Sequence, residues 1–232
     1  EVVSTADKVL AKDPQQPQAH ALKIAVLAVE GKLSDATTKA EALRSQFPTE
    51  PDVAILLATL YGQQQRYHDA QATLQSALNA HPKDMDILNN LNRSLVQAKD
   101  MAGAETVARR MIEVEPTLFD HRLRLARFFN EQGAHEKAEG VLREAIALDP
   151  DSEERRLLLA DFLSARKDHP AAERSLLEAA TQLPHSTKIQ FGLASLYLTS
   201  GQDAKARERY ASLVKDYKGK PSGFEAKVKL AE

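Results

Sequence analysis

The chain has 232 residues, with 31 Lys+Arg against 33 Asp+Glu and a formal net charge of −2 at pH 7. This balance lacks the basic excess typical of nucleic-acid-binding proteins, and hydrophobic residues at 43% supply enough apolar side chains for a folded core. The sequence has no cysteine, which excludes disulfides and thiolate chemistry, and no apolar run of about eighteen residues that would predict a membrane span.

The strongest pattern in the sequence is a period of 34 residues. Six of the ten prolines follow it: Pro14, Pro48, Pro82, Pro116, Pro150 and Pro184. A second column is entirely alanine: Ala36, Ala70, Ala104, Ala138, Ala172 and Ala206. A third is leucine after its first member, Lys23: Leu57, Leu91, Leu125, Leu159 and Leu193. A fixed period of this length predicts stacked structural repeats.

In chain order, the elements begin with one helix over 1–13 that ends at Pro14 and has Ala6, Val9 and Leu10 on its apolar face. We interpret 1–16 as the second helix of a truncated repeat within a single solenoid over 1–232. Six full repeats are expected to follow, at 17–50, 51–84, 85–118, 119–152, 153–186 and 187–220. The segment 221–232 is expected to form a helix from about Phe224, after a three-residue insertion. This helix is either the first of a further repeat or a polar cap.

Each repeat is predicted to be a pair of helices. In the fourth, apolar residues at helical spacing predict one helix over 119–130 and a second over 136–148. Gly133 is suited to end the first helix, because glycine adopts the left-handed conformation common at helix C-termini. Pro150 ends the second, because the residue before a proline is disfavoured in the α region.

The order of residues in these hairpins resembles the tetratricopeptide repeat. The second repeat shows the pattern best, with Leu57, Ala58, Tyr61, Ala70, Leu74, Ala77 and Pro82. The resemblance implies an all-α, right-handed α-solenoid, a superhelix whose first helices line the concave side. Two features depart from the family. Lys23 and Ile24 replace the leucine and small residue of the first repeat, and the frequent tryptophan is replaced throughout, by His20, Ala54, Leu88, Arg122, Arg156 and Gln190.

The resemblance implies a protein-interaction scaffold without catalytic activity, which binds an extended or helical segment of a partner protein in its concave groove. Columns that project away from the second helices predict the groove residues: Asn89, Asn90, Arg93, Arg124, Arg127, Asn130, Ile55, Leu157 and Phe191. One hypothesis is that Arg93 and Arg127 anchor an acidic or C-terminal group through charge-assisted hydrogen bonds. The alternative is that both are solvated arginines paired with Asp120, Glu131 or Asp161.

One subset of the family docks heat-shock chaperones by gripping a terminal carboxylate with two lysines, two asparagines and an arginine. Asn90 and Arg124 match two of these five positions. Ile55 and Thr59 stand where a lysine and an asparagine are needed, and Asp120 replaces the other lysine. Chaperone docking of this kind is therefore not expected.

No motif in the sequence predicts catalysis, a metal or a cofactor. The seven histidines include no HExxH and no pair at i,i+4, and no glycine-rich phosphate-binding motif occurs. Two alternatives to a hetero-partner scaffold stay open: an accessory array of a larger enzyme such as a glycosyltransferase, and a self-assembling homo-oligomer. The composition resembles bacterial arrays of envelope biogenesis, secretion or exopolysaccharide export. That resemblance favours the periplasm or cell envelope, with the cytoplasm as the alternative.

Overall fold

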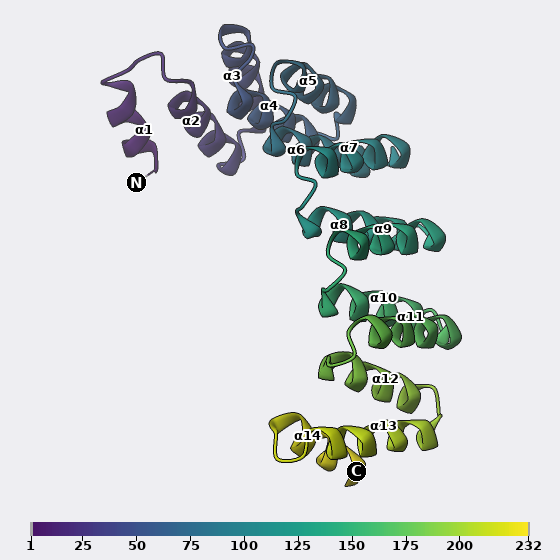
Figure 1. The fold of residues 1–232 in the computed structure, drawn as a ribbon. Coiled ribbons are helices and arrows are strands. Elements are labelled where there is room, and N and C mark those ends of the chain that lie inside the picture. Colours follow the sequence, from purple (N-terminus) through teal and green to yellow (C-terminus); the bar gives the residue numbers. More distant parts are fainter. Residues whose placement is uncertain (1, 232) are drawn as a thin grey trace. The chain divides into compact units, whose positions relative to one another are not determined.

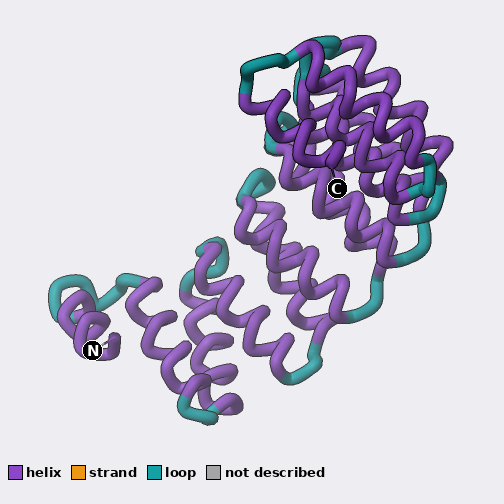
Figure 2. Tube along the Cα trace, turned by 90° about the horizontal axis from the view of Figure 1, so that it is seen from below, coloured by secondary structure: helices purple, strands orange, loops and turns teal. Residues whose placement is uncertain are grey.

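The computed structural model describes residues 2–231, and this range forms fourteen α-helices and no strand (Figure 1). Short loops join the helices (Figure 2). The chain divides into two compact bodies, the N-terminal body (Glu1–Pro116) and the C-terminal body (Thr117–Glu232). None of the helices in the described range is long and apolar enough to cross a bilayer. The all-α fold class is confirmed, whereas the single solenoid and its repeat boundaries stay predictions.

The N-terminal body is a stack of seven described helices in which each helix packs against the next. They are α1 (Val2–Leu10), α2 (Pro17–Val29), α3 (Leu33–Gln46), α4 (Pro51–Gln63), α5 (Tyr67–Ala80), α6 (Met85–Gln97) and α7 (Met101–Val114). In addition, α2 contacts α4, and α4 contacts α6. The first helices of successive hairpins therefore lie side by side.

The C-terminal body repeats this arrangement. Its described helices are α8 (Phe119–Glu131), α9 (His135–Leu148), α10 (Glu153–Ala165), α11 (His169–Gln182), α12 (Thr187–Thr199), α13 (Asp203–Asp216) and α14 (Pro221–Ala231). Consecutive helices pack together, and α10 also contacts α12. Sequential packing of antiparallel helix pairs is the arrangement expected of a tetratricopeptide solenoid.

The alanine column explains why the two helices of each hairpin approach closely. All six alanines lie on the second helices and are at most 1% exposed, namely Ala36, Ala70, Ala104, Ala138, Ala172 and Ala206. A buried methyl group is small enough for neighbouring helix backbones to come near, and a larger side chain would overpack the contact. The alanines that repeat every 34 residues thus mark the positions where the two helices of each hairpin pack most closely.

A left-handed residue ends the first helix of every full hairpin. Gly31, Gly133 and Gly201 have φ of 82°, 72° and 73°, as the glycine column predicts. The same position in the other three hairpins also has positive φ, although it is occupied by Gln65, Lys99 and Lys167. In each hairpin the next residue donates its N–H to the carbonyl five residues earlier, as Arg66 does to Tyr61. This bond is characteristic of a Schellman motif.

The start of α14 corrects one expectation from the sequence. The helix begins at Pro221, which lies 34 residues after Thr187, the first residue of α12. Pro221 therefore shares the first-turn position of Pro17 and Pro51, where proline costs no hydrogen bond. The expected three-residue insertion does not exist, because Pro221 is a helix-starting proline and not a delayed helix-stopping one.

Two of the polar side chains that stand in place of the family's frequent tryptophan, His20 and Arg156, bond to the loop before their helix. The His20 ring nitrogen Nε2 lies 2.8 Å from the Pro14 carbonyl oxygen. Arg156, which is 5% exposed, donates from Nε and Nη2 to the Pro150 carbonyl at 2.8 and 2.6 Å, and from Nη2 to Gln182 Oε1. Each side chain therefore ties the start of a hairpin to the loop that precedes it.

Candidate functional site

A polar pocket lies on the first helices α4 and α6 of the N-terminal body. Its volume is about 190 Å³. It is lined by Ala58, Thr59, Gly62, Gln63, Leu74, Asn90, Arg93, Ser94 and Gln97. Two of the predicted groove residues, Asn90 and Arg93, belong to it. The pocket exists because α4 and α6 are neighbours and carry small or polar residues, such as Ala58 and Gly62, on their facing surfaces.

Arg93 gives this pocket its charge. Its guanidinium is exposed, and Nη1 donates a hydrogen bond to Asn90 Oδ1 at 3.4 Å. Asn90 in turn donates from Nδ2 to the Asp86 carbonyl at 2.8 Å, which holds the amide in place. Arg93 forms no ion pair with any residue in the described range. Its positive charge is therefore available to an anionic group of a ligand.

Uncharged hydrogen-bonding groups surround this cation. The side-chain amides of Gln63 and Gln97 line the pocket without a hydrogen bond to another described residue. The Ser94 hydroxyl is buried and likewise has no partner within the described range. A buried hydroxyl left unpaired costs about 1–3 kcal/mol. A ligand that supplied a partner would recover part of that free energy.

Ser94 and Gln63 were absent from the predicted site. Ser94 occupies the repeat position that Leu60 and Leu196 occupy in other repeats, and both leucines are nearly fully buried. A serine at this otherwise apolar position is an exception that the sequence alone could have indicated. Gln63 and Gln97 are one 34-residue period apart and one helical turn beyond Thr59 and Arg93. The sequence pattern already places Gln97 in the groove, and its column one repeat earlier contains Gln63.

The other predicted residues of the N-terminal body, Ile55 and Asn89, are half-buried and do not line this pocket. Their role in a groove stays a prediction.

In the C-terminal body, Arg124, Arg127 and Asn130 are exposed on α8. Arg124 Nε pairs with Asp120 Oδ2 at 2.6 Å, one turn earlier on the same helix. Asn130 Oδ1 lies 3.1 Å from His135 Nδ1. Arg127 forms no ion pair or hydrogen bond with a described residue. Arg124 is therefore neutralised by an ion pair within its own helix. The positive charge of Arg127 is not neutralised by any described residue.

The predicted apolar residues of the C-terminal body, Leu157 and Phe191, are half-buried by packing contacts. The Phe191 ring lies 6.0 Å from the Tyr210 ring on the second helix α13. A methyl group placed on Gly192 would lie 2.6 Å from Leu157 Cδ2, so the leucine fills the space that this glycine leaves. On α10, burial raises the pKa of the Asp161 carboxyl.

The nine predicted residues belong to different bodies, four to the first and five to the second. The structure brings Asn90 and Arg93 into one pocket, and the other seven predicted residues do not line that pocket. A continuous groove made by all nine stays a prediction. Within the described range, no group of three histidine, aspartate or glutamate side chains is arranged to hold a metal ion.

Three family models match the chain. The model described as "Psidin, N-terminal TPR repeats region" matches residues 1–119, which is more than half of the sequence. Two models described as "Tetratricopeptide repeat" match residues 129–178 and 189–219. The chain therefore belongs to the tetratricopeptide repeat family. Repeats of this family generally mediate protein–protein interactions, and their fold is generally non-catalytic. No curated protein matches the chain significantly.

Solved structures show the same fold at low sequence identity. The structure of Naa15/Naa10 bound to HypK-THB matches 98% of this chain with a TM-score of 0.55 and 19% identity, and this chain spans 36% of that one. A tetratricopeptide repeat protein from Parabacteroides merdae matches 92% of the chain, with a TM-score of 0.51, 18% identity and 85% of its own length covered. PilF of Pseudomonas aeruginosa matches 94% of the chain, with a TM-score of 0.50, 15% identity and 99% of its own length covered.

Proposed function

We propose that this chain is a non-catalytic scaffold that binds a segment of a partner protein along its first helices. The observation that carries the proposal is the polar pocket between α4 and α6, where Arg93 has no counter-ion among the described residues. A C-terminal carboxylate or an acidic side chain of the partner would pair with Arg93. The amides of Gln63, Asn90 and Gln97 would bind the adjoining peptide groups.

Rigid helices support such a role physically. The lining residues lie on packed helices and not on loops, so little conformational freedom is lost when a peptide binds. Hydrogen bonds that involve a charged donor are also stronger than neutral ones. Arg127 on α8 offers a similar exposed cation in the C-terminal body, and we extend the proposal to it as a second, independent contact.

The test begins with a peptide selected against the whole chain from a library of random peptides with free C-termini. Its affinity is then measured for the unaltered chain, for Arg93→Glu, for Arg127→Glu and for the double variant. We expect Arg93→Glu to weaken binding by about tenfold or more, since each factor of ten corresponds to about 1.4 kcal/mol. The matched control is Arg174→Glu, because Arg174 is exposed on the second helix α11. Unchanged affinity in the double variant would refute anchoring by the two arginines.

A further inference from the structure

A second cavity of the N-terminal body lies away from the polar pocket, between α1 and α3 with α2 as its floor. Its volume is about 540 Å³. Its lining is Val3 of α1, His20, Lys23, Ile24, Val26, Leu27 and Glu30 around α2, and Lys39, Ala42, Leu43 and Gln46 of α3. We call it the α1–α3 groove. Its lining combines an apolar floor with a polar rim.

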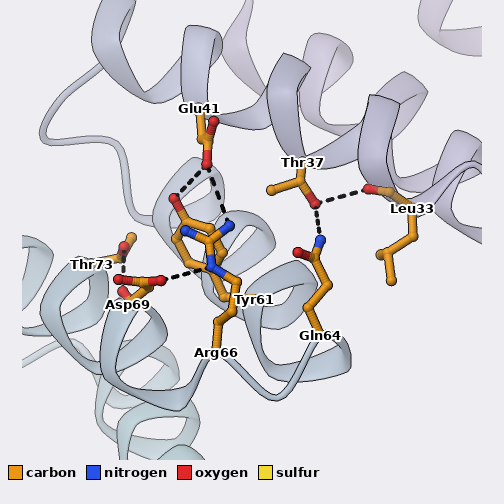
Figure 3. A network of polar contacts seen from close by, with 8 residues as sticks. All are labelled: Leu33, Thr37, Glu41, Tyr61, Gln64, Arg66, Asp69 and Thr73. Atoms are coloured by element: carbon orange, nitrogen blue, oxygen red, sulfur yellow. Dashed lines mark hydrogen bonds and ion pairs between the residues drawn. The ribbon is translucent and has the colours of Figure 1, made fainter.

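The counterpart of this groove one repeat later, between α3 and α5, is filled by Tyr61. Figure 3 shows the Tyr61 ring reaching from α4 toward Glu41 on α3, and its hydroxyl donates to Glu41 Oε1 at 2.8 Å. The Arg66 guanidinium lies over the ring, 4.2 Å from its centre. Beside the ring, Gln64 Nε2 donates to Thr37 Oγ1 at 2.6 Å. An aromatic ring and two hydrogen bonds thus close the space.

The first hairpin lacks the ring and both hydrogen bonds of this closure. Leu27 stands 34 residues before Tyr61, so the ring and its hydroxyl are missing. Val3 and Glu30 stand where Thr37 and Gln64 form their hydrogen bond, and valine has no polar side-chain atom with which to form one. The space that a tyrosine fills between α3 and α5 is therefore left open between α1 and α3.

A similar aromatic closure occurs in the C-terminal body. Tyr197, four periods after Tyr61, is 3% exposed, and its hydroxyl donates to Glu173 Oε1 on the preceding second helix at 2.9 Å. The column therefore holds an aromatic ring in three of the six repeats, at Tyr61, Phe129 and Tyr197, and leucine in the other three, at Leu27, Leu95 and Leu163. The α1–α3 groove has the shape to accept such a ring from elsewhere.

The rim of the groove carries an unneutralised positive charge. Lys39 lines the groove and forms no hydrogen bond or ion pair with a described residue. The other charged residues of the rim are neutralised locally. Lys23 Nζ pairs with Asp7 Oδ1 at 2.7 Å, and Glu30 Oε2 pairs with Lys32 Nζ at 2.9 Å. The charge that would complement the groove is therefore negative.

We propose that the α1–α3 groove binds an aromatic side chain of a partner protein, with an acidic residue beside it in the partner's sequence. The ring would pack on Ile24, Leu27 and Leu43, in the place that Tyr61 takes one repeat later. The neighbouring carboxylate would pair with Lys39. Burial of an aromatic side chain of about 150–250 Å² supplies the affinity, and the ion pair sets the orientation. This site does not depend on Arg93 or on the proposed groove of the first helices.

The test uses blocked tripeptides as probes of the whole chain, with binding followed by NMR shifts of the Val3, Leu27 and Leu43 methyl groups. The probe is acetyl-Glu-Phe-Gly-amide. Acetyl-Glu-Ala-Gly-amide removes the ring, acetyl-Lys-Phe-Gly-amide reverses the charge, and decanoate tests for a fatty acyl ligand. Saturable shifts are expected with the first peptide and weaker ones with the other two. Equal binding of the alanine peptide, tighter binding of decanoate, or no saturable shift with any peptide overturns the proposal.

Two variants locate the site. Leu27→Tyr restores the residue that the repeat carries at Tyr61, and it should weaken binding of the Glu-Phe peptide by about tenfold or more because the new ring occupies the groove. Lys39→Gln should remove the preference for the Glu-Phe over the Lys-Phe peptide. Lys12→Gln, on an exposed lysine outside the groove, is the control and should leave binding unchanged. Wild-type affinity in both Leu27→Tyr and Lys39→Gln would contradict the site.

Discussion

The substitution of glycine by alanine in two helices should change stability in opposite directions. Gly140 lies exposed within α9, and an added methyl group would meet no atom within 4 Å. Alanine there should stabilise the chain by about 0.5–1 kcal/mol, because glycine loses more conformational freedom in a helix. At Gly223 in α14, the same methyl group would lie 2.2 Å from the Tyr217 carbonyl oxygen and 2.8 Å from its carbon.

The contact at Gly223 is with backbone, which cannot rotate away as a side chain can. Alanine at that position should therefore displace α14 from α13 and cost about 1–3 kcal/mol, the range for overpacked sites. The expected difference between the two variants is about 1.5–4 kcal/mol. Gly223 and Ala226 are the buried residues of α14, so the loss should be concentrated in this helix.

Urea unfolding of Gly140→Ala and Gly223→Ala measures the global effect, and amide hydrogen exchange along α14 measures the local one. Faster exchange in α14 is expected for Gly223→Ala alone. Equal stabilisation by both substitutions would refute the reasoning, since it would mean that helix propensity outweighs the close approach to Tyr217.

Three further outcomes are expected. Burial, followed by the hydrogen bond to Glu41, raises the pKa of Tyr61 to about 12. The pKa of a tyrosine in the unfolded chain is about 10, so the folded state favours the neutral phenol. The resulting contribution to the free energy of unfolding is complete below about pH 10 and is lost as the pH rises toward about 12. Urea unfolding of Tyr61→Phe should lack this component of the decline, and identical pH profiles would contradict it. Arg156→Met should destabilise by about 1–3 kcal/mol in urea, because the Pro150 carbonyl loses its donors, whereas the exposed Arg174→Met should not. Lys99→Gly should raise the thermal midpoint by the equivalent of about 0.5–1 kcal/mol, since it relieves a left-handed φ of 61°. A lower midpoint would show that glycine's freedom in the unfolded chain dominates.

The hairpins could be predicted from sequence because their determinants recur. The alanine column marks the closest helix contacts, and all six members are buried as expected. The predicted helices over 119–130 and 136–148 correspond to α8 and α9 within one residue at each end. Gly133 ends α8 in the left-handed region, as glycine's freedom implies. These features depend on local conformation and on contacts that every repeat makes in the same way.

The candidate site could be predicted only in part, because it depends on contacts that differ between repeats. Column arithmetic identified Asn90 and Arg93, and the structure places both in one pocket. It did not indicate that Arg124 pairs with Asp120 on its own helix, or that Phe191 packs against Tyr210. Side-chain rotamers and hydrogen-bond partners decide these contacts, and a one-dimensional period contains neither.

What the sequence determined by itself is the repeated part of this molecule: the 34-residue period, the helix pairs, their tight alanine contacts and the family to which they point. The tertiary structure decided where that regularity fails. Among the described residues, the Ser94 hydroxyl beside Arg93 has no hydrogen-bond partner, and a groove is left open where Leu27 replaces the ring that Tyr61 supplies one repeat later. A substitution in a repeat becomes a cavity or a polar pocket only through the neighbouring helices, whose side chains either fill the vacant space or leave it open.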